Sequence, residues 1–170
     1  SVLALWNEPG GMLAQLRDFP NERYATADEG LAAILRTQIT GVDVLKKKLG
    51  TPMGRLNQGV AQPYQAEAWR SRQSIENLQA SLQGAQAVWE RVRSLVSDAA
   101  LVKDIDQAYA DVANQLAALP APLMELVQEP ARRETLTTLY AALDNLENRQ
   151  QTELARNLNI QIGFNANDGD

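Results

Sequence analysis

The chain has 170 residues, and its 16 Lys and Arg against 21 Asp and Glu give a formal net charge of −5. It contains neither Cys nor His. These two absences exclude a disulfide framework, a thiol nucleophile, a zinc site with Cys or His ligands and a Ser-His-Asp triad. The acidic balance argues against nucleic acid as a partner, because phosphate binding requires a concentrated basic surface. The length suits a single domain over residues 1–170.

Apolar residues recur at helical spacing along nearly the whole chain. A short opening helical segment, with apolar Val2, Leu3, Leu5 and Trp6, stops at Pro9-Gly10-Gly11. The first long helix is expected to begin at Thr26, because Thr26 and Glu29 have the spacing of a capping box. Gly50, with Pro52 just beyond it, predicts the end of that helix.

The densest basic run, Lys46–Lys48, falls near the end of this first long helix. We interpret it as a solvated helix end, where cations are common. The alternative is a contact with phosphate or lipid. No apolar stretch approaches the roughly 18–20 residues that a bilayer-spanning helix needs, so we do not expect the chain to span a membrane.

Residues 50–64 contain three Gly and two Pro and are predicted to form a long inter-helix loop. The second long helix is expected over residues 65–96, because its apolar residues from Ile75 onward alternate in steps of three and four. Loops of this length in compact helical domains are often functional or held against another element.

Two further long helices complete the pattern. Ser97-Asp98 offers a cap for the third, which ends at Pro120, and the fourth begins near Pro130, where proline suits a first turn. Polar Gln150 is the one irregularity in the apolar stripe of the fourth helix. The sequence therefore predicts an all-α protein: an up-and-down four-helix bundle with a short N-terminal helical segment and an irregular C-terminal tail.

The stretch 62–78 has the least regular pattern in the chain. On a helix its polar residues would fall on neighbouring positions beside a tryptophan, and the candidate ligand-site residues are Glu67, Trp69, Arg70, Ser71 and Ser74. One interpretation is a solvent-facing first turn with a Glu67–Arg70 or Glu67–Ser71 pair. The other is a polar patch that packs against, or completes, a site on another domain.

Carboxylates are the only strong metal ligands that this chain offers. Di-iron bundles use Glu-x-x-His pairs, which cannot be formed without His, and the glutamates of the second half are scattered along the sequence: Glu125, Glu129, Glu134, Glu147 and Glu153. We predict no metal site, no catalytic residue and no cofactor within this chain alone.

The tail, residues 160–170, changes abruptly from helical spacing to Gly, Asn and Asp. It does not fit the calcium-loop pattern D-x-[DN]-x-[DN]-G, because Gly169 at the sixth position places Phe164 at the first. We expect a structural clasp in which Ile162 and Phe164 hold the tail against the bundle.

Separate segments of the chain together resemble the imelysin family of bacteria. The ending IQIGFNANDGD resembles the family's GFN-x-x-DGD motif, here Gly163, Phe164, Asn165, Asp168, Gly169 and Asp170. KKKLGTPMG followed by WRSRQSIENLQASLQG resembles a helix–loop–helix passage of the family, with Gly84 as its later glycine. Trp6 and the YATADEGLAAIL run fit the same half of the domain.

The resemblance implies a periplasmic or surface-attached bacterial protein, in some members a lipoprotein, linked to iron uptake. It covers the C-terminal half of a family domain that consists of two helical bundles. The family is named for a metallopeptidase with a GxHxxE motif in its N-terminal half, and a chain without His cannot contain that motif. Either this chain is a fragment of a longer protein, or it is a divergent relative without the first bundle.

Three functions follow as hypotheses. In the first, the chain is a non-catalytic binding or scaffold half that packs on an N-terminal bundle carrying GxHxxE. In that case iron or another divalent metal would bind the full-length protein, with contributions from the stretch 62–78 and from the tail. The second is a metallopeptidase that is active only at full length. The third is a plain cytoplasmic helical bundle that acts as an adaptor. Exposed seam surface could also make the isolated chain dimerise.

Overall fold

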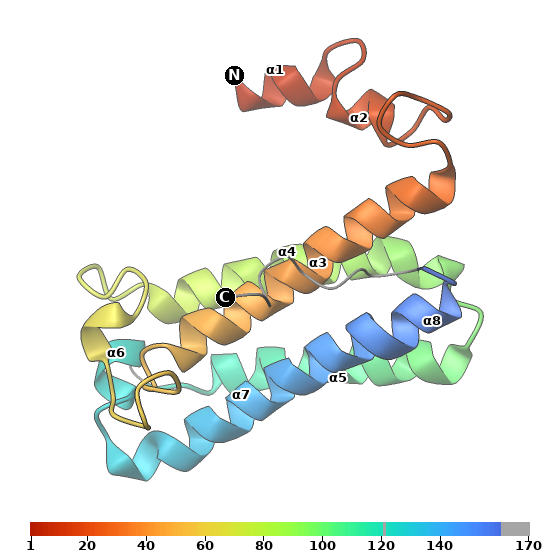
Figure 1. Cartoon of the computed structure of the whole chain (residues 1–170). Helices are drawn as coiled ribbons and strands as arrows, with labels where there is room; N and C mark the ends of the chain where they lie inside the picture. The colour runs from red at the N-terminus through yellow and green to blue at the C-terminus, as the bar shows by residue number, and fades with distance from the viewer. Residues whose placement is uncertain (121, 161–170) are drawn as a thin grey trace.

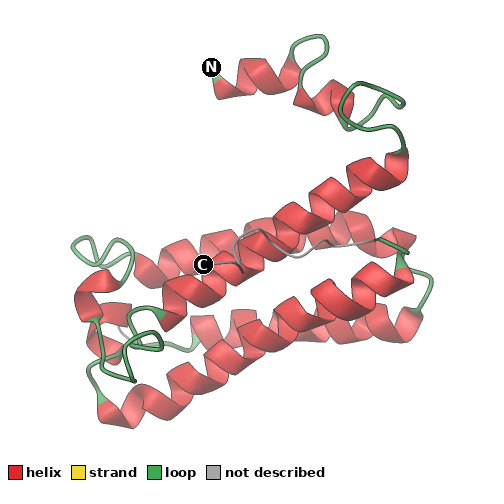
Figure 2. Ribbon diagram, viewed as in Figure 1, coloured by secondary structure: helices red, strands yellow, loops and turns green. Residues whose placement is uncertain are grey.

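A computed structural model describes residues 1–120 and 122–160, and the regular structure in those ranges is helical (Figure 2). Its α-helices are α1 (Val2–Asn7), α2 (Met12–Gln15), α3 (Ala27–Gly50), α4 (Ser74–Val92), α5 (Ala99–Ala117), α6 (Leu123–Leu126), α7 (Arg133–Asn148) and α8 (Ala155–Asn157). Single 3-10 turns occupy Pro63–Gln65, Arg93–Leu95 and Pro130–Arg132, and a π-helical stretch, Arg149–Leu154, joins α7 to α8.

The long helices α3, α4, α5 and α7 run alternately in opposite directions (Figure 1). Each packs against the next in the chain, and α7 closes the arrangement by packing against α3. The predicted all-α fold and its up-and-down bundle are confirmed.

The core consists of the apolar stripes that the spacing predicts. Leu35, Val42 and Leu49 of α3 and Leu139 and Leu146 of α7 are almost completely buried. Among the described residues, the largest buried side chains are Trp89 of α4 and Tyr109 of α5. The indole Nε1 of Trp89 donates a hydrogen bond to Asp106 at 2.7 Å, and the hydroxyl of Tyr109 accepts hydrogen bonds from two buried glutamines. A buried aromatic residue with a polar tip is stable only when that tip has a partner.

The helix starts that the sequence marks most clearly are confirmed. The Glu29 N–H donates to the hydroxyl of Thr26 at 3.3 Å, and the Glu29 carboxylate accepts from the N–H of Ala25 at 2.7 Å. The carboxylate of Asp98 accepts from the N–H groups of Ala100 and Leu101 in the first turn of α5. Both caps satisfy donors that the helix itself leaves unpaired.

α3 ends at Gly50 as predicted, but not because Gly50 adopts a left-handed backbone. The left-handed glycines of the loop that follows are Gly54 and Gly59, each with φ 79°. A Cβ atom on Gly50 would lie 2.8 Å from the ring of Tyr140 on α7, so glycine here allows an aromatic ring to approach the helix closely.

The predicted start of the second long helix is wrong. α4 begins at Ser74 rather than at Gln65, because Ala68 and Arg72 adopt left-handed backbones (φ 52° and 62°) that no α-helix can contain. Turns occupy most of this segment, and Ala66 within it is buried against the core.

The fourth long helix begins with the 3-10 turn Pro130–Arg132 and changes to π-helical geometry at Arg149. Gln150, the irregular residue of the stripe, is 1% exposed and donates from its amide to the hydroxyl of Tyr109 at 2.8 Å. The π-helical stretch therefore begins where a polar side chain interrupts the apolar stripe. π-Bulges within α-helices are frequent at functional sites.

Residues 1–25, which we call the N-terminal arm, contain α1 and α2 and lie beyond the start of α3, outside the bundle (Figure 1). The arm is anchored by Tyr24, which is buried, and by Phe19, whose ring fills the space where Gly30 of α3 lacks a side chain. No helix in the described part of the chain is long and apolar enough to cross a membrane. The tail predicted to act as a clasp, residues 161–170, lies outside the described residues.

Replacing Leu143 or Leu82 by Ala should lower the free energy of unfolding by about 2–5 kcal/mol, because each leucine lies in the closed core. Leu95→Ala is the matched control, since Leu95 is 55% exposed and its truncation should cost about 0.5 kcal/mol or less. Urea unfolding followed by circular dichroism measures all three. A cost below about 1 kcal/mol for both core variants would contradict the core assignment.

Candidate functional site

The segment 63–73, which we call the entry turn, leads into α4 at the end of the bundle where α6 lies. Ser74, the first residue of α4, is 2% exposed, and its hydroxyl donates a hydrogen bond to the backbone carbonyl of Glu67. The Ser71 hydroxyl donates to the carbonyl of Ala68 at 3.1 Å. These two hydroxyls stabilise the turns of the segment, so the predicted residues come together through a folded loop and not along a helix face.

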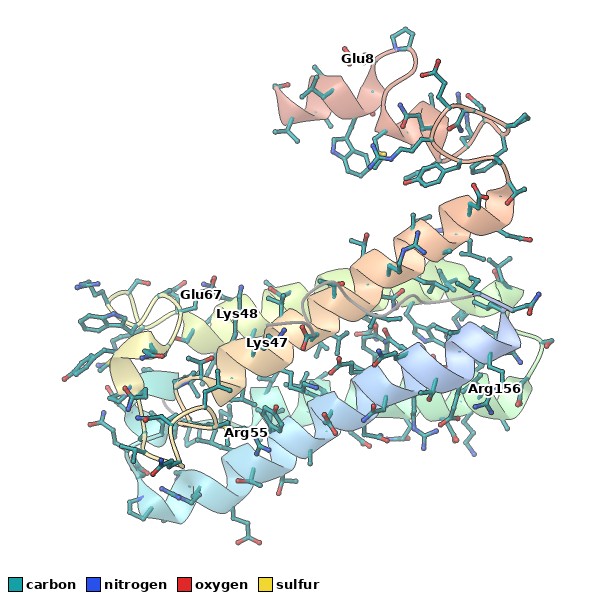
Figure 3. The ribbon with its side chains drawn as sticks, in the orientation of Figure 1. Glu8, Lys47, Lys48, Arg55, Glu67 and Arg156 are labelled. Carbon is teal, nitrogen blue, oxygen red and sulfur yellow. The ribbon has the colours of Figure 1, made fainter. Side chains whose placement is uncertain are left out.

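Helical spacing predicts that Glu67 pairs with Arg70 or Ser71, but its partner in the structure is a lysine of α3. Its carboxylate lies 2.9 Å from the ammonium of Lys48 on α3, and both side chains are partly exposed (Figure 3). The pair joins the entry turn to the last turn of α3. An ion pair at this exposure contributes little to stability, about 0–1 kcal/mol, and leaves the carboxylate open to solvent.

Trp69 and Arg70 form a small stacked group with Tyr64. The ring centroids of Trp69 and Tyr64 are 4.9 Å apart in an edge-to-face arrangement, and the guanidinium of Arg70 lies 4.2 Å from the Trp69 ring. Trp69 also packs against the hydrophobic core. Arg72 pairs with Glu125 of α6 at 2.8 Å, which ties the entry turn to a second neighbour.

The five predicted site residues therefore lie in one compact segment, with Ser74 buried and Glu67, Arg70 and Ser71 at the surface. Their polar atoms are held by contacts within the segment and with α3. Such an arrangement can present a carboxylate and a guanidinium beside an aromatic surface. Its role in binding stays a prediction.

The basic run Lys46–Lys48 is solvated only in part: the Lys47 side chain is 60% exposed, whereas Lys46 is largely buried. The ammonium of Lys46 pairs with Glu147 and, at 3.0 Å, with Asp144, and only 16% of its side chain is exposed. Burial alone would lower the pKa of Lys46, but its hydrogen bonds with Glu147 and Asp144 outweigh that effect and raise the pKa. Lys47 pairs with Asp43 at 2.7 Å.

A buried polar network that the sequence does not reveal joins three elements. The hydroxyl of Tyr109 on α5 accepts hydrogen bonds from Gln38 of α3 at 2.9 Å and from Gln150 of the π-helical stretch at 2.8 Å. Burial raises the pKa of Tyr109, and the two amide donors offset part of that shift. The side-chain oxygens of Gln38 and Gln150 are buried without a hydrogen-bond partner among the described residues.

An apolar groove of about 630 Å³ lies between α3, α4 and the N-terminal arm, and we call it the α3–α4 groove. It is lined by Trp6, Met12 and Leu16 of the arm, Ile34, Gly41 and Val44 of α3, and Gly84, Ala85 and Val88 of α4, with Gln38 and Lys48 among its polar lining residues. The apolar spacing of the sequence does not predict this groove. The clue was two glycines inside long helices, where glycine is destabilising.

The described residues contain no group of three or more His, Cys, Asp or Glu that could hold a metal ion. Several of their acidic side chains pair with lysines and arginines on neighbouring elements instead, as at Lys46 and Arg72. The described part of the chain thus does not fit an autonomous metal site.

A family model described as Imelysin (Peptidase_M75) matches residues 1–150. That range includes the N-terminal arm, the entry turn and both walls of the α3–α4 groove. The C-terminal GFN-x-x-DGD motif lies beyond it. No curated protein and no solved structure matches the chain.

Tyr109→Phe should lower the free energy of unfolding at neutral pH by about 1–3 kcal/mol, because two buried amides lose their acceptor. The wild type should also lose more stability than this variant at alkaline pH. Folding raises the pKa of Tyr109 above its ordinary value of 10.0, so its contribution is complete below that pH and falls as the pH rises through the folded value.

Urea unfolding of both proteins, from neutral to strongly alkaline pH, measures this difference. Lys46 contributes a loss in the same direction to both proteins, so the comparison isolates Tyr109. Tyr64→Phe is the control, since Tyr64 is 66% exposed. Identical pH profiles for wild type and Tyr109→Phe would contradict the buried, protonated tyrosine.

Proposed function

The chain belongs to the imelysin family, and on this premise we propose that it is the non-catalytic binding and scaffold half of a bacterial imelysin-like protein. Its partner in this proposal is an N-terminal bundle of the same protein, which carries the GxHxxE motif. The whole protein would work in the periplasm or at the outer surface, in the uptake of iron or another metal.

The observation that carries the proposal is the exposed apolar surface of the N-terminal arm. Four large aliphatic side chains there are half or more exposed: Val2 (73%), Leu3 (70%), Leu5 (62%) and Leu13 (50%). They lie close together in the sequence on α1 and α2, outside the bundle. Neighbouring exposed apolar side chains mark an interaction surface, and a helical partner with an apolar stripe would cover this one.

The chemistry of the chain supports a non-catalytic role. Hydrolysis by a zinc peptidase requires about three protein ligands, usually including His, and a base to activate water. The whole chain lacks His and Cys. A metal bound by the full-length protein would therefore take its nitrogen ligands from the N-terminal bundle.

The entry turn is this half's proposed contribution to a cleft between the two bundles. Glu67, Arg70 and Ser71 are exposed there, next to the stacked ring of Trp69. Asn165, Asp168 and Asp170 of the tail are the second proposed contribution.

Intact-mass measurement and N-terminal sequencing of the protein from its source, together with its metal content, test the proposal. We expect a longer protein that contains a GxHxxE segment and bound metal. A native product that begins at Ser1 and binds no metal would contradict it. Peptidase activity of the longer protein on an unstructured protein substrate would instead favour the alternative, a metallopeptidase active only at full length.

Leu3→Glu should leave the melting temperature of the 170-residue chain unchanged, because Leu3 is exposed there. In the longer protein the same change should lower the melting temperature and expose the arm to limited proteolysis, since a carboxylate would be buried at the interface. Leu95→Glu is the matched control, because Leu95 is similarly exposed but follows α4, outside the arm. Equal effects of the two variants in the longer protein would contradict an interface at the arm.

A further inference from the structure

We propose that the loop after α3, residues 51–62, and the start of α7 form a binding site for a phosphate monoester, in which Arg55 and Arg133 hold the phosphate group. We call this site the arginine pocket. It shares no residue with the N-terminal arm or the entry turn, on which the proposed function rests. Phosphate binding here can therefore succeed or fail without deciding that function.

The loop after α3 is closed by its own hydrogen bonds. The N–H of Gln62 donates to the carbonyl of Pro52 at 2.8 Å, and the N–H of Gly59 donates to the carbonyl of Gly54 at 2.9 Å. A Cβ atom on Gly54 would collide with the backbone of Val60, so glycine allows two strands of the loop to meet here. Compact surface loops whose ends lie close together are frequently functional.

Two arginines connect this loop to α7. The guanidinium of Arg55 lies 3.8 Å from the centre of the Tyr140 ring, beside α7 (Figure 3). Arg133, the first residue of α7, donates from its guanidinium to the carbonyl of Gly59 at 3.4 Å. Stacking uses the face of a guanidinium and leaves the N–H groups in its plane able to donate. Both side chains are thus held in place with donors to spare.

The positive charge of the arginine pocket is not compensated. Within the described residues, the polar contacts of the two arginines are with a ring and a carbonyl, and no carboxylate pairs with either one. The described residues that line the pocket include no Asp or Glu: Met53, Arg55, Gly59, Val127, Arg133, Leu136 and Thr137. A second pocket with two arginines, Arg23 and Arg36, is different because Asp28 and Glu29 also line it.

The charge of the arginine pocket favours phosphate over carboxylate. Two guanidiniums bring two positive charges, and a phosphate monoester carries a charge of about −1.5 to −2 near pH 7 together with three acceptor oxygens. A single carboxylate would leave one guanidinium uncompensated. Guanidinium N–H groups also bind phosphate oxygens in pairs, which gives the contact its geometry.

The start of α7 adds to the positive potential. This helix has 16 residues, and no side chain caps its N-terminus. The N-terminal end of a helix carries a partial positive charge and attracts anions. Glu134 lies in the same first turn, but it does not line the pocket. The helix therefore supports the two arginines, which carry most of the charge.

The remaining lining of the arginine pocket is largely apolar and suits an ester better than free phosphate. Leu136 is buried, and Met53 and Val127 pack against the hydrophobic core. The volume of about 150 Å³ is small, with room for roughly five atoms of the size of water, as many as a phosphate group contains. An organic substituent can replace water at the apolar side of the pocket, which favours binding.

Isothermal titration calorimetry of the 170-residue chain with phenyl phosphate, inorganic phosphate and benzoate, at equal ionic strength, tests the proposal. We expect phenyl phosphate to bind with a Kd of roughly 1 mM or below, and both other anions about tenfold more weakly. Without saturable binding of phenyl phosphate, or with benzoate bound equally well, the phosphate site is wrong. Inorganic phosphate bound as tightly as phenyl phosphate would overturn the assignment of an ester.

Arg55→Gln and Arg133→Gln should each weaken the binding of phenyl phosphate about tenfold, because each removes charge-assisted hydrogen bonds. Arg133→Lys should restore only part of the loss, since an ammonium keeps the charge but not the paired N–H groups. Arg91→Gln is the matched control: Arg91 is exposed on α4 and does not line the pocket. Equal weakening by all three Gln variants would contradict a site at the arginine pocket.

Both arginines of the pocket are exposed, so the variants should keep the circular dichroism spectrum of the wild type. If Arg55→Gln loosens the loop, the comparison of Arg133→Gln with Arg91→Gln decides. Proton–nitrogen correlation spectra locate the ligand directly. The Nε–H signals of Arg55 and Arg133, assigned by their loss in the Gln variants, should shift when phenyl phosphate is added, and shifts confined to other arginines would overturn the proposal.

Discussion

The hydroxyl of Tyr109 is the point on which the arrangement of the bundle depends. It lies on α5 and accepts hydrogen bonds from α3 and from the π-helical stretch after α7, so it sets the positions of these elements along one another. A buried amide that loses its partner costs about 1–3 kcal/mol, whereas a slipped leucine stripe can find new apolar contacts. The network therefore specifies register, which the leucines alone would leave loosely defined. The same network fixes the position of Gln38, which lines the α3–α4 groove.

Sequence reasoning succeeded where local chemistry decides the structure. Thr26 and Asp98 cap helices because their side chains reach the nearest free N–H groups, and no distant contact is needed. It failed at the start of α4, where Glu67, Ala68 and Arg70 are good helix formers and no proline or glycine intervenes. There the burial of Ala66 and the packing of Trp69 against the core outweigh local preference. A left-handed alanine is a consequence of tertiary packing, which a single sequence does not display.

The candidate site was predicted in part for the same reason. The five residues from Glu67 to Ser74 do lie together, because any compact connection would keep neighbours in sequence close in space. Their partners could not be predicted, since Lys48 and Glu125 come from other elements. The α3–α4 groove was missed because Gly41, Gly84 and Ala85 interrupt no stripe. An apolar pattern shows which helix face is buried, but it does not show where small residues from two helices coincide to leave a space.

The basic run at the end of α3 connects these features. Consecutive helix positions point about 100° apart, so three neighbouring lysines reach three different places: Lys46 pairs with α7, Lys47 with Asp43 of its own helix, and Lys48 with the entry turn. Lys48 also lines the groove. The ion pair between Glu67 and Lys48 is therefore shared by the entry turn and the groove. A change in charge at Glu67 must alter the potential at the end of the groove where Lys48 lies, so the two surfaces are electrostatically coupled although they belong to different loops and helices.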